Sequence, residues 1–138
     1  MSEVNDYNRG VIEEFRANRG KLTGPFDGTP LVLLTTTGAK SGQKRVNPVM
    51  ALEESDALYV FASKAGAPTN PDWYHNLLAN PEVEVEFGDQ HFDALATNVT
   101  GPERDRLYAA QVERFPGFGD YQKATERTIP VVALRRRS

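Results

Sequence analysis

The chain contains no cysteine and only two histidines among its 138 residues. Without a thiol, disulfides, thiolate catalysis and cysteine-based zinc or iron–sulfur sites are excluded, and two histidines give little support to a metal site. No stretch approaches the ~20 apolar residues that a membrane-spanning helix needs. We therefore expect an ordinary globular protein that holds no metal.

The chain also has no excess of positive charge. The formal net charge is −3, whereas nucleic-acid binders usually carry an excess of lysine and arginine over a wide face, so we expect no nucleic-acid partner. The polar, acidic first ten residues do not resemble a secretory signal, and a cytoplasmic location is expected. The length suits one domain, residues 1–138, with one site; a homodimer that completes this site is an open alternative.

The first part of the chain predicts a helix, a loop and a strand. Apolar residues recur at helical spacing in residues 3–20, which predicts a one-sided helix ending at Gly20. This helix packs on its own domain or touches a membrane surface, and both alternatives stay open. Residues 21–30 are rich in glycine and proline and predict a loop. Residues 31–37 (LVLLTTT) predict a well-buried strand.

Two further strands are predicted at residues 45–52 and 57–63, joined by the acidic turn EESD. Pro48 has no N–H to donate, so its strand should lie at a sheet edge or carry a bulge there. Asn70 as N-cap and Pro71 as first helical residue predict a short helix, which the next Asn-Pro pair closes.

The remainder predicts a hairpin, a helix and a last strand. Residues 83–87 alternate in polarity, and the following Gly-Asp turn returns the chain in residues 91–99. Thr100 and Glu103 form the pattern of a capping box for a helix that reaches about Phe115. Residues 129–134 (IPVVAL) predict the last strand. Helices separated by strand pairs indicate an α+β fold around a mostly antiparallel sheet or barrel, with its core in residues 31–134.

The turn after the first strand is basic. From residue 28 to residue 52 there is no acidic side chain. If the strands on either side of EESD pair, the numbers of two partners sum to about 109, which places Lys64 beside Arg45. The same reasoning applied to the turn GAKSGQK places Thr37 beside Arg45. Basic and acidic side chains then lie at opposite sheet ends, ~25 Å apart at ~3.3 Å per residue. The basic end holds Thr35, Thr37, Lys40, Ser41, Lys44, Arg45 and Lys64, and the acidic end holds Glu53, Glu54 and Asp56.

Backbone N–H groups and cations in such a turn suit a phosphate or carboxylate, with a solvated basic turn as the alternative. The string TGAKSG is not a P-loop, because Ala39 separates Gly38 from Lys40. No serine lies in G-x-S-x-G, so a serine hydrolase is not supported. His75 is interpreted as structural. Helical spacing predicts core positions for Trp73, Leu77 and Leu78.

Three segments, in order, resemble the deazaflavin-dependent nitroreductase family of actinobacteria, which are F420H2-dependent reductases. The resemblance covers most of residues 31–134 and implies a split β-barrel, related to FMN-binding barrels, that binds coenzyme F420. The phosphate and glutamate chain of F420 make its tail a polyanion, which matches the basic turn. The segments are LLTTTGAKSGQKRVNPVM, FASKAGAPTNPDWYHNLLANPEVEVE and FPGFGDYQKATERTIPVVAL.

The resemblance also implies site residues. The phosphate and adjacent tail would be held by Lys40, Ser41, Lys44 and Arg45. The cofactor would be lined by Pro48, Val49 and Met50, with Ser63, Lys64, Ala65 and Gly66 near the deazaflavin ring and Pro71, Trp73 and Asn76 completing the pocket. By this resemblance the protein aligns the reduced cofactor with an electron-poor acceptor, a quinone, enone or unsaturated lactone, or a nitroaromatic.

The acceptor would meet Phe115, Phe118 and Tyr121, which share one face if their segment is helical. A nitroimidazole-activating relative presents tyrosines at these three positions, so only the Tyr121 hydroxyl is kept here, as a candidate proton donor. This departure favours quinones and enones over nitroimidazoles. Core packing of the three rings is an alternative. A non-catalytic F420 carrier, and an FMN-dependent or pyridoxal-phosphate-linked oxidoreductase on the same barrel, are the alternative functions.

Overall fold

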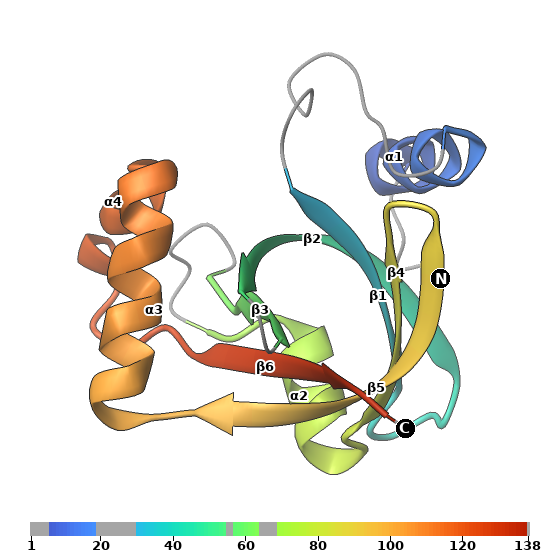
Figure 1. The fold of residues 1–138 in the computed structure, drawn as a ribbon. Coiled ribbons are helices and arrows are strands. Elements are labelled where there is room, and N and C mark those ends of the chain that lie inside the picture. The colour runs from blue at the N-terminus through green and yellow to red at the C-terminus, as the bar shows by residue number, and fades with distance from the viewer. Residues whose placement is uncertain (1–5, 19–29, 55–56, 64–68, 138) are drawn as a thin grey trace.

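Six antiparallel strands close into a barrel in a computed structural model that describes residues 6–18, 30–54, 57–63 and 69–137. The strand order around the barrel is β1-β2-β3-β6-β5-β4 (Figure 1). The expected α+β split barrel with flanking helices is confirmed. The strands are β1 (Leu31–Thr37), β2 (Lys44–Glu54), β3 (Ala57–Phe61), β4 (Glu82–Phe87), β5 (Gln90–Val99) and β6 (Val131–Arg136), and the helices are α1 (Asp6–Ala17), α2 (Asp72–Ala79), α3 (Gly101–Arg114) and α4 (Gly117–Lys123).

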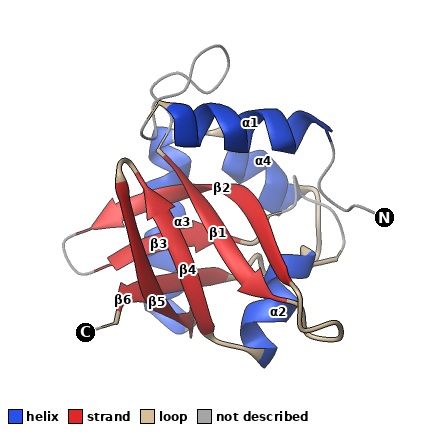
Figure 2. Cartoon of the chain, turned by 90° about the vertical axis from the view of Figure 1, so that its right-hand side faces the viewer, coloured by secondary structure: helices blue, strands red, loops and turns tan. Residues whose placement is uncertain are grey.

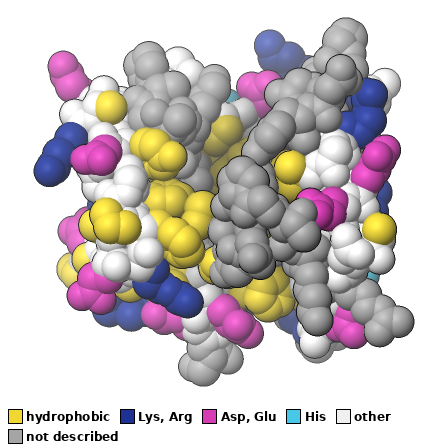
Figure 3. All heavy atoms as spheres, turned by 90° about the horizontal axis from the view of Figure 1, so that it is seen from above, with side chains coloured by type: hydrophobic (Ala, Val, Ile, Leu, Met, Phe, Trp, Pro, Cys, Tyr) yellow, Lys and Arg dark blue, Asp and Glu magenta, His cyan; other side chains and the backbone are white. Residues whose placement is uncertain are grey.

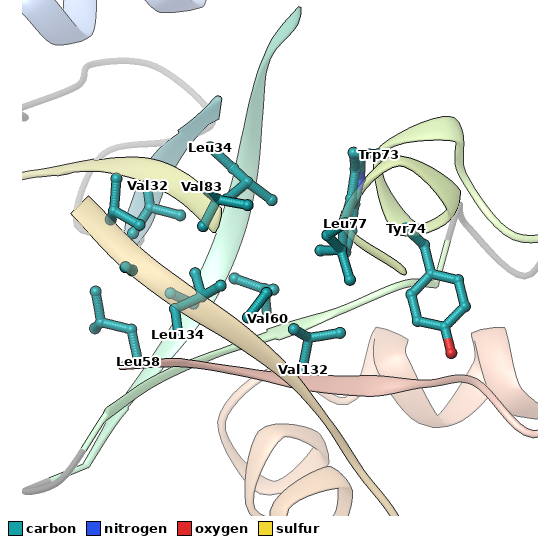
Figure 4. Packing of buried hydrophobic residues seen from close by; sticks show 14 of the residues in the cluster. Val32, Leu34, Leu58, Val60, Trp73, Tyr74, Leu77, Val83, Val132 and Leu134 are labelled. Carbon is teal, nitrogen blue, oxygen red and sulfur yellow. The ribbon is translucent and has the colours of Figure 1, made fainter. Parts of the chain in front are cut away.

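Alternation along the strands divides the apolar side chains between the barrel interior and its outside. On β1, Val32 and Leu34 belong to the interior cluster, whereas Leu31 and Leu33 belong to the cluster under α1. Helix α2 lies across one end of the barrel (Figures 1 and 2), and its Trp73 and Leu77 face the interior side chains (Figure 4). The interior is thus filled by side chains, and sites must lie at the ends or edges of the barrel.

Two helical layers cover different outer faces of the barrel. Helix α1 covers β1 and β2 through Phe15, which is 2% exposed. On the opposite side, α3 and α4 pack their Leu107 and Phe118 against Tyr59 of β3 and its neighbours (Figure 1). Burial of each large apolar side chain contributes about 1.5–3 kcal/mol, so these layers hold the fold together. Within the described residues, no helix has the length and apolar character to cross a membrane.

The strand registers differ from the predicted ones. Thr36, not Thr37, faces Arg45, because the turn of residues 38–43 is closed by the Gly38 N–H donating to the Gln43 carbonyl over 2.8 Å. Ala51 faces Val60, where the prediction placed Leu58. The second shift arises because β2 continues to Glu54, into the predicted EESD turn, so that Glu54 faces Ala57. Lys64 lies outside the described residues.

The edge position predicted for Pro48 is confirmed. Pro48 faces Leu33 of β1, whereas β2 pairs with β3 only from Ala51 to Glu54. Along its first half, β2 therefore has a ladder partner on one side only among the described residues, and there the missing N–H of Pro48 breaks no ladder hydrogen bond. This unpaired half of β2 borders the pocket described below.

The helix ends and a core position also differ from the predictions. Pro71, not Asn70, is the N-cap of α2. Thr100 is the N-cap of α3, but it makes no side-chain cap hydrogen bond. Glu103 instead accepts hydrogen bonds from Arg106 at 3.0 and 2.6 Å, so the capping box does not form. Leu78, predicted in the core, is 53% exposed.

The first helix and last strand are displaced at their ends. Helix α1 occupies Asp6–Ala17 within the predicted 3–20 range, and Gly20 and the predicted loop 21–29 lie outside the described residues. Strand β6 begins at Val131 and extends to Arg136, so the sequence pattern placed it two residues early.

Candidate functional site

A pocket of about 670 Å³ lies between the turn of residues 38–43, the start of β2 and helix α2. Two segments distant in sequence, residues 38–47 and 72–76, thus meet at one end of the barrel. Three of the seven residues of the predicted basic end line it, Lys40, Ser41 and Arg45. The lining residues are Gly38, Ala39, Lys40, Ser41, Arg45, Val46, Asn47, Asp72, His75 and Asn76.

The turn beside this pocket is held in one conformation by close contacts. A Cβ atom on Gly38 would lie 2.5 Å from the Ser41 Oγ, so only glycine fits there without movement. The Ser41 Oγ accepts a hydrogen bond from the Gln43 N–H over 3.1 Å. Gly42 has φ of 73°, a left-handed conformation that favours glycine. These two glycines explain the local shape of the turn.

Helix α2 is fastened to the same turn by two asparagines. The Asn76 Oδ1 accepts from the Ala39 N–H over 3.0 Å, and the Asn76 Nδ2 donates to the Thr36 Oγ1 over 3.2 Å. One turn further along, the Asn80 Nδ2 donates to the Thr37 carbonyl over 3.3 Å. The Asn76 amide therefore joins two walls of the pocket.

The predicted basic cluster is divided between two faces of β2. Arg45 lines the pocket together with Lys40, and within the described parts of the chain Lys40 makes no ion pair or hydrogen bond. Lys44 does not line the pocket, because successive strand residues point to opposite faces. Its Nζ lies 3.5 Å from a Glu84 carboxylate oxygen. The pocket thus has two permanent cations, opposed by the carboxylate of Asp72.

His75 was predicted to be structural, but its side chain is exposed and lines the pocket. It therefore presents a polar ring to the pocket. Its ring lies edge-on to Tyr74 with centroids 6.0 Å apart.

The residues predicted along the cofactor lie beside the pocket and not in its lining. Val49 packs against the barrel interior, and Met50 packs against the clusters under α1 and α3. Trp73 is 6% exposed and turned inward. Pro71 is buried and Ser63 and Pro48 are half-buried. The predicted residues Lys64, Ala65 and Gly66 lie outside the described residues.

The three predicted acceptor residues lie near one another around helix α4. Phe118 is 6% exposed, and its ring lies edge-on to Phe61 at 5.8 Å, so core packing accounts for it. Tyr121 lies on the same helix, with its ring 5.2 Å from that of Phe118. Phe115 caps the end of α3. Phe115 and Tyr121 are half-buried, and within the described residues the Tyr121 hydroxyl has no hydrogen-bond partner.

The face of the molecule that is uppermost in Figure 1 is apolar in its middle. Viewed from above, hydrophobic side chains gather between the α4 side and the α1 side, with charged side chains around the periphery (Figure 3). Tyr108 of α3 packs against Phe118 of α4 with ring centroids 6.4 Å apart, and its hydroxyl donates to the Phe118 carbonyl over 2.6 Å. Burial raises the pKa of this Tyr108 hydroxyl, which stays protonated as a structural donor.

Sequence reasoning missed Arg127. Its Nη1 donates to the Asn70 Oδ1 over 2.6 Å and to the Ala62 carbonyl over 3.2 Å, and its Nη2 donates to the Ser63 carbonyl over 2.9 Å. Burial lowers the pKa of the guanidinium, although arginine stays charged in proteins. A lone arginine in a polar connecting segment carries no pattern that predicts these contacts.

The chain is similar to several known proteins in sequence and in fold. The family model for F420H(2)-dependent quinone reductase matches residues 7–136. The F420H(2)-dependent quinone reductase Rv1261c of Mycobacterium tuberculosis (strain ATCC 25618 / H37Rv) is 39% identical over 127 residues, covering 89% of this chain and 85% of that protein. The solved F420-H2 dependent reductase FDR-A is 45% identical with a TM-score of 0.71, covering 77% of this chain and 94% of that one. A solved domain-swapped dimer is 37% identical with a TM-score of 0.73, covering 92% and 95%.

Proposed function

The chain belongs to the F420H2-dependent quinone reductase family, and from this membership we propose that it binds coenzyme F420 beside β2 and α2 and reduces a small quinone-type acceptor. The observation that carries the proposal is the pocket at the basic turn, in which Lys40 has no partner among the described residues. Lys40 is exposed, and an exposed ammonium group with no counter-ion can form a charge-assisted hydrogen bond with an anionic ligand.

The residues present fit the anionic tail of F420. Lys40 and Arg45 supply positive charge on two sides of the pocket. The Ser41 Oγ accepts from the Gln43 N–H, which leaves the hydroxyl proton available to donate to a phosphate oxygen. Asp72 disfavours an anion at its own side of the pocket and thereby selects how the tail lies. Lys44 would act only at longer range, because it is paired with Glu84.

The apolar part of the cofactor would lie along the unpaired half of β2. Pro48, Val49, Met50 and Ser63 are the described residues proposed to border it, with Trp73 fixing α2 from behind. Pro71 and Asn76 would complete this wall, Asn76 by holding the turn and α2 together. Lys64, Ala65 and Gly66 remain proposed ring contacts from the resemblance alone.

Reduced F420 supplies hydride to the acceptor when it is bound. The chain's own residues would orient a flat acceptor against aromatic side chains and exclude water from it. Phe115 and Tyr121 are the half-buried rings proposed to do so, with Phe118 supporting Tyr121 from the core. The free Tyr121 hydroxyl would donate a hydrogen bond, and then a proton, to the acceptor oxygen that gains negative charge.

A fluorescence titration with F420 and with FMN tests the cofactor, followed by F420H2 oxidation with menadione, a cyclic enone and a bicyclic nitroimidazole. We expect F420 to bind more tightly than FMN and the quinone to be reduced fastest. Comparable affinity for FMN would instead support the flavin-dependent alternative. Tight F420 binding without oxidation by any acceptor would support a carrier protein.

We also propose that the protein forms a homodimer, because a domain-swapped dimer of similar sequence shares the fold over most of the chain. Light scattering at several concentrations measures the mass directly. A mass of one chain at every concentration would contradict this proposal and leave the cofactor proposal untouched.

A further inference from the structure

Helix α2, one wall of the tail pocket, is fastened at three places along its length. The Asn76 and Asn80 amides tie its middle and its end to residues of β1 and the following turn. Its beginning is tied differently, because Asn70, just before the N-cap, accepts a 2.6 Å hydrogen bond from the Arg127 guanidinium. The position of the helix start thus depends on a residue 57 positions away in the sequence.

The same guanidinium holds the end of β3. Its Nη1 donates to the Ala62 carbonyl over 3.2 Å, and its Nη2 donates to the Ser63 carbonyl over 2.9 Å. These carbonyls lie past the last β3 residue, Phe61, where the ladder with β6 ends. A planar guanidinium presents donors in a fixed fork, so it holds its acceptors at one spacing, which a flexible ammonium cannot do.

Arg127 is itself fixed from the side of α4. The Gln122 Nε2 donates to the Arg127 carbonyl over 2.7 Å, and Gln122 is the neighbour of Tyr121 on α4. The Gln122 Oε1 accepts from the Ile129 N–H over 3.0 Å, which holds the chain on the other side of Arg127. One short segment therefore connects the helix of the proposed acceptor residue with the strand end and the helix beside the proposed cofactor.

We propose that Arg127 is a positioning residue of the cofactor site, which holds the start of α2, one wall of the tail pocket, at a fixed distance from the end of β3. This inference rests on the proposed function for its consequence on F420 binding. Its structural part, the placement of α2, does not depend on the ligand.

Arg104 provides a matched control. Its guanidinium is also mostly buried and also holds the 122–129 segment, with bonds to the Ile129 carbonyl at 3.0 and 2.8 Å and to the Gln122 Oε1 at 2.7 Å. Its hydrogen bonds reach neither α2 nor the end of β3. Loss of Arg104 should therefore cost stability like loss of Arg127, without changing the position of α2.

The experiment compares Arg127→Met, Arg127→Lys and Arg104→Met in three measurements. These are the Tm, the Kd for F420 by fluorescence titration, and the acrylamide quenching of Trp73, which is the single tryptophan of the chain and lies on α2. Arg127→Lys serves as the second variant if Arg127→Met does not fold, because it keeps the charge.

For Arg127→Met we expect the Kd to rise about tenfold, equal to about 1.4 kcal/mol, and Trp73 to become more accessible to acrylamide. Arg127→Lys should recover part of both changes. Arg104→Met should lower the Tm while leaving the Kd within about twofold. An Asn70→Ala change should add little to Arg127→Met, because both remove the same contact.

Equal Kd values and equal Trp73 quenching in Arg127→Met and Arg104→Met, at similar losses in Tm, would overturn the inference. If the unmodified protein does not bind F420, the proposed function fails. In that case Trp73 quenching alone decides about Arg127, and an exposed Trp73 in Arg127→Met still supports its positioning role.

Discussion

Two lysines four positions apart in one basic segment have different surroundings. Lys40 lies in the turn before β2 and lines the pocket, without a partner among the described residues. Lys44 lies on the face of β2 that points away from the pocket, and its Nζ is 3.5 Å from a Glu84 carboxylate oxygen. Composition treats the two lysines as equivalent, although only one of them offers an unneutralised charge to a ligand.

Lys40→Ala should weaken F420 binding by about 1.5–3 kcal/mol, the usual contribution of a charge-assisted hydrogen bond. Lys44→Ala is the matched control, and we expect it to have a clearly smaller effect. Titrations at low and high salt measure both, and the difference between Lys40→Ala and the parent should narrow as salt is added. Equal losses in the two variants would show that the tail does not enter this pocket.

Tyr121→Phe should lower kcat for a quinone by about tenfold to a hundredfold, because one donor to the developing oxyanion is lost. The Kd for F420 should change little, since Tyr121 lies on α4 and outside the tail pocket. Steady-state kinetics with menadione and a nitroimidazole check this. An unchanged kcat, or faster reduction of the nitroimidazole by the parent, would contradict the acceptor role.

Gln111 of α3 is fully buried, and its side-chain amide has no hydrogen-bond partner within the described residues. Such an unpaired amide costs about 1–3 kcal/mol. Gln111→Leu should therefore leave the free energy of unfolding unchanged or raise it by about 1 kcal/mol. Urea denaturation measures the free energy of unfolding. Tyr108→Phe is the control that should lower it, because that change removes a 2.6 Å hydrogen bond to the Phe118 carbonyl. A large loss of stability in Gln111→Leu would reveal a polar partner.

At the scale of elements, the turn of residues 38–43 decides the shape of the pocket. It joins β1 to β2, supplies lining residues, and receives the Asn76 side chain of α2 through the Ala39 N–H. Its two glycines act for different reasons. Gly38 is confined by neighbouring atoms, whereas Gly42 has open space around its Cα and only its positive φ requires glycine.

Gly38→Ala should lower both stability and F420 affinity, because the new Cβ would collide with the Ser41 Oγ at 2.5 Å. Gly42→Ala should cost only about 1–2 kcal/mol of stability, the price of a left-handed alanine. Adding Ser41→Ala should restore part of the stability of Gly38→Ala, since it removes the colliding atom. Thermal unfolding of these variants measures the effect, and strict additivity of the two changes would argue against this contact.

At the scale of the whole molecule, the closed barrel makes a rigid scaffold and places the site at its end. The interior is filled by the apolar side chains of five or more elements, so it has no room for a cofactor. Helices α1 and α3 cover separate outer faces, and the end beside α2 is left for ligands. Segments 38–47 and 72–76 meet at this end although they are far apart in sequence.

A ligand that binds only the folded protein stabilises it by about 2.7 kcal/mol at a concentration of 100 Kd. F420 should therefore raise the Tm in a concentration-dependent manner, whereas FMN at the same concentration should raise it less. Differential scanning fluorimetry measures both, with Lys40→Ala as the control that should reduce the F420 shift. An equal shift by FMN would favour a flavin-dependent protein.

Much of the fold follows from the sequence because its signals are local. The alternation of residues 83–87, the β-branched run of β1 and the proline at an edge each indicate an element from a few neighbouring residues. The family resemblance, which rests on three ordered segments, predicted the barrel, which the structure confirms, and the cofactor class, which we propose above. The absence of cysteine and the basic turn also required no structure.

The tertiary structure decided the relations between distant segments. A register error of one residue in the β1–β2 pair is invisible in the sequence, yet it changes which side chains lie opposite each other. The sequence could not separate Lys40 from Lys44, because the direction in which the turn and the strand point each side chain depends on the tertiary structure. Arg127 binds carbonyls and an amide more than fifty positions away, and backbone carbonyls carry no sequence signal. Such contacts depend on how the barrel closes, and closure is a property of the whole chain.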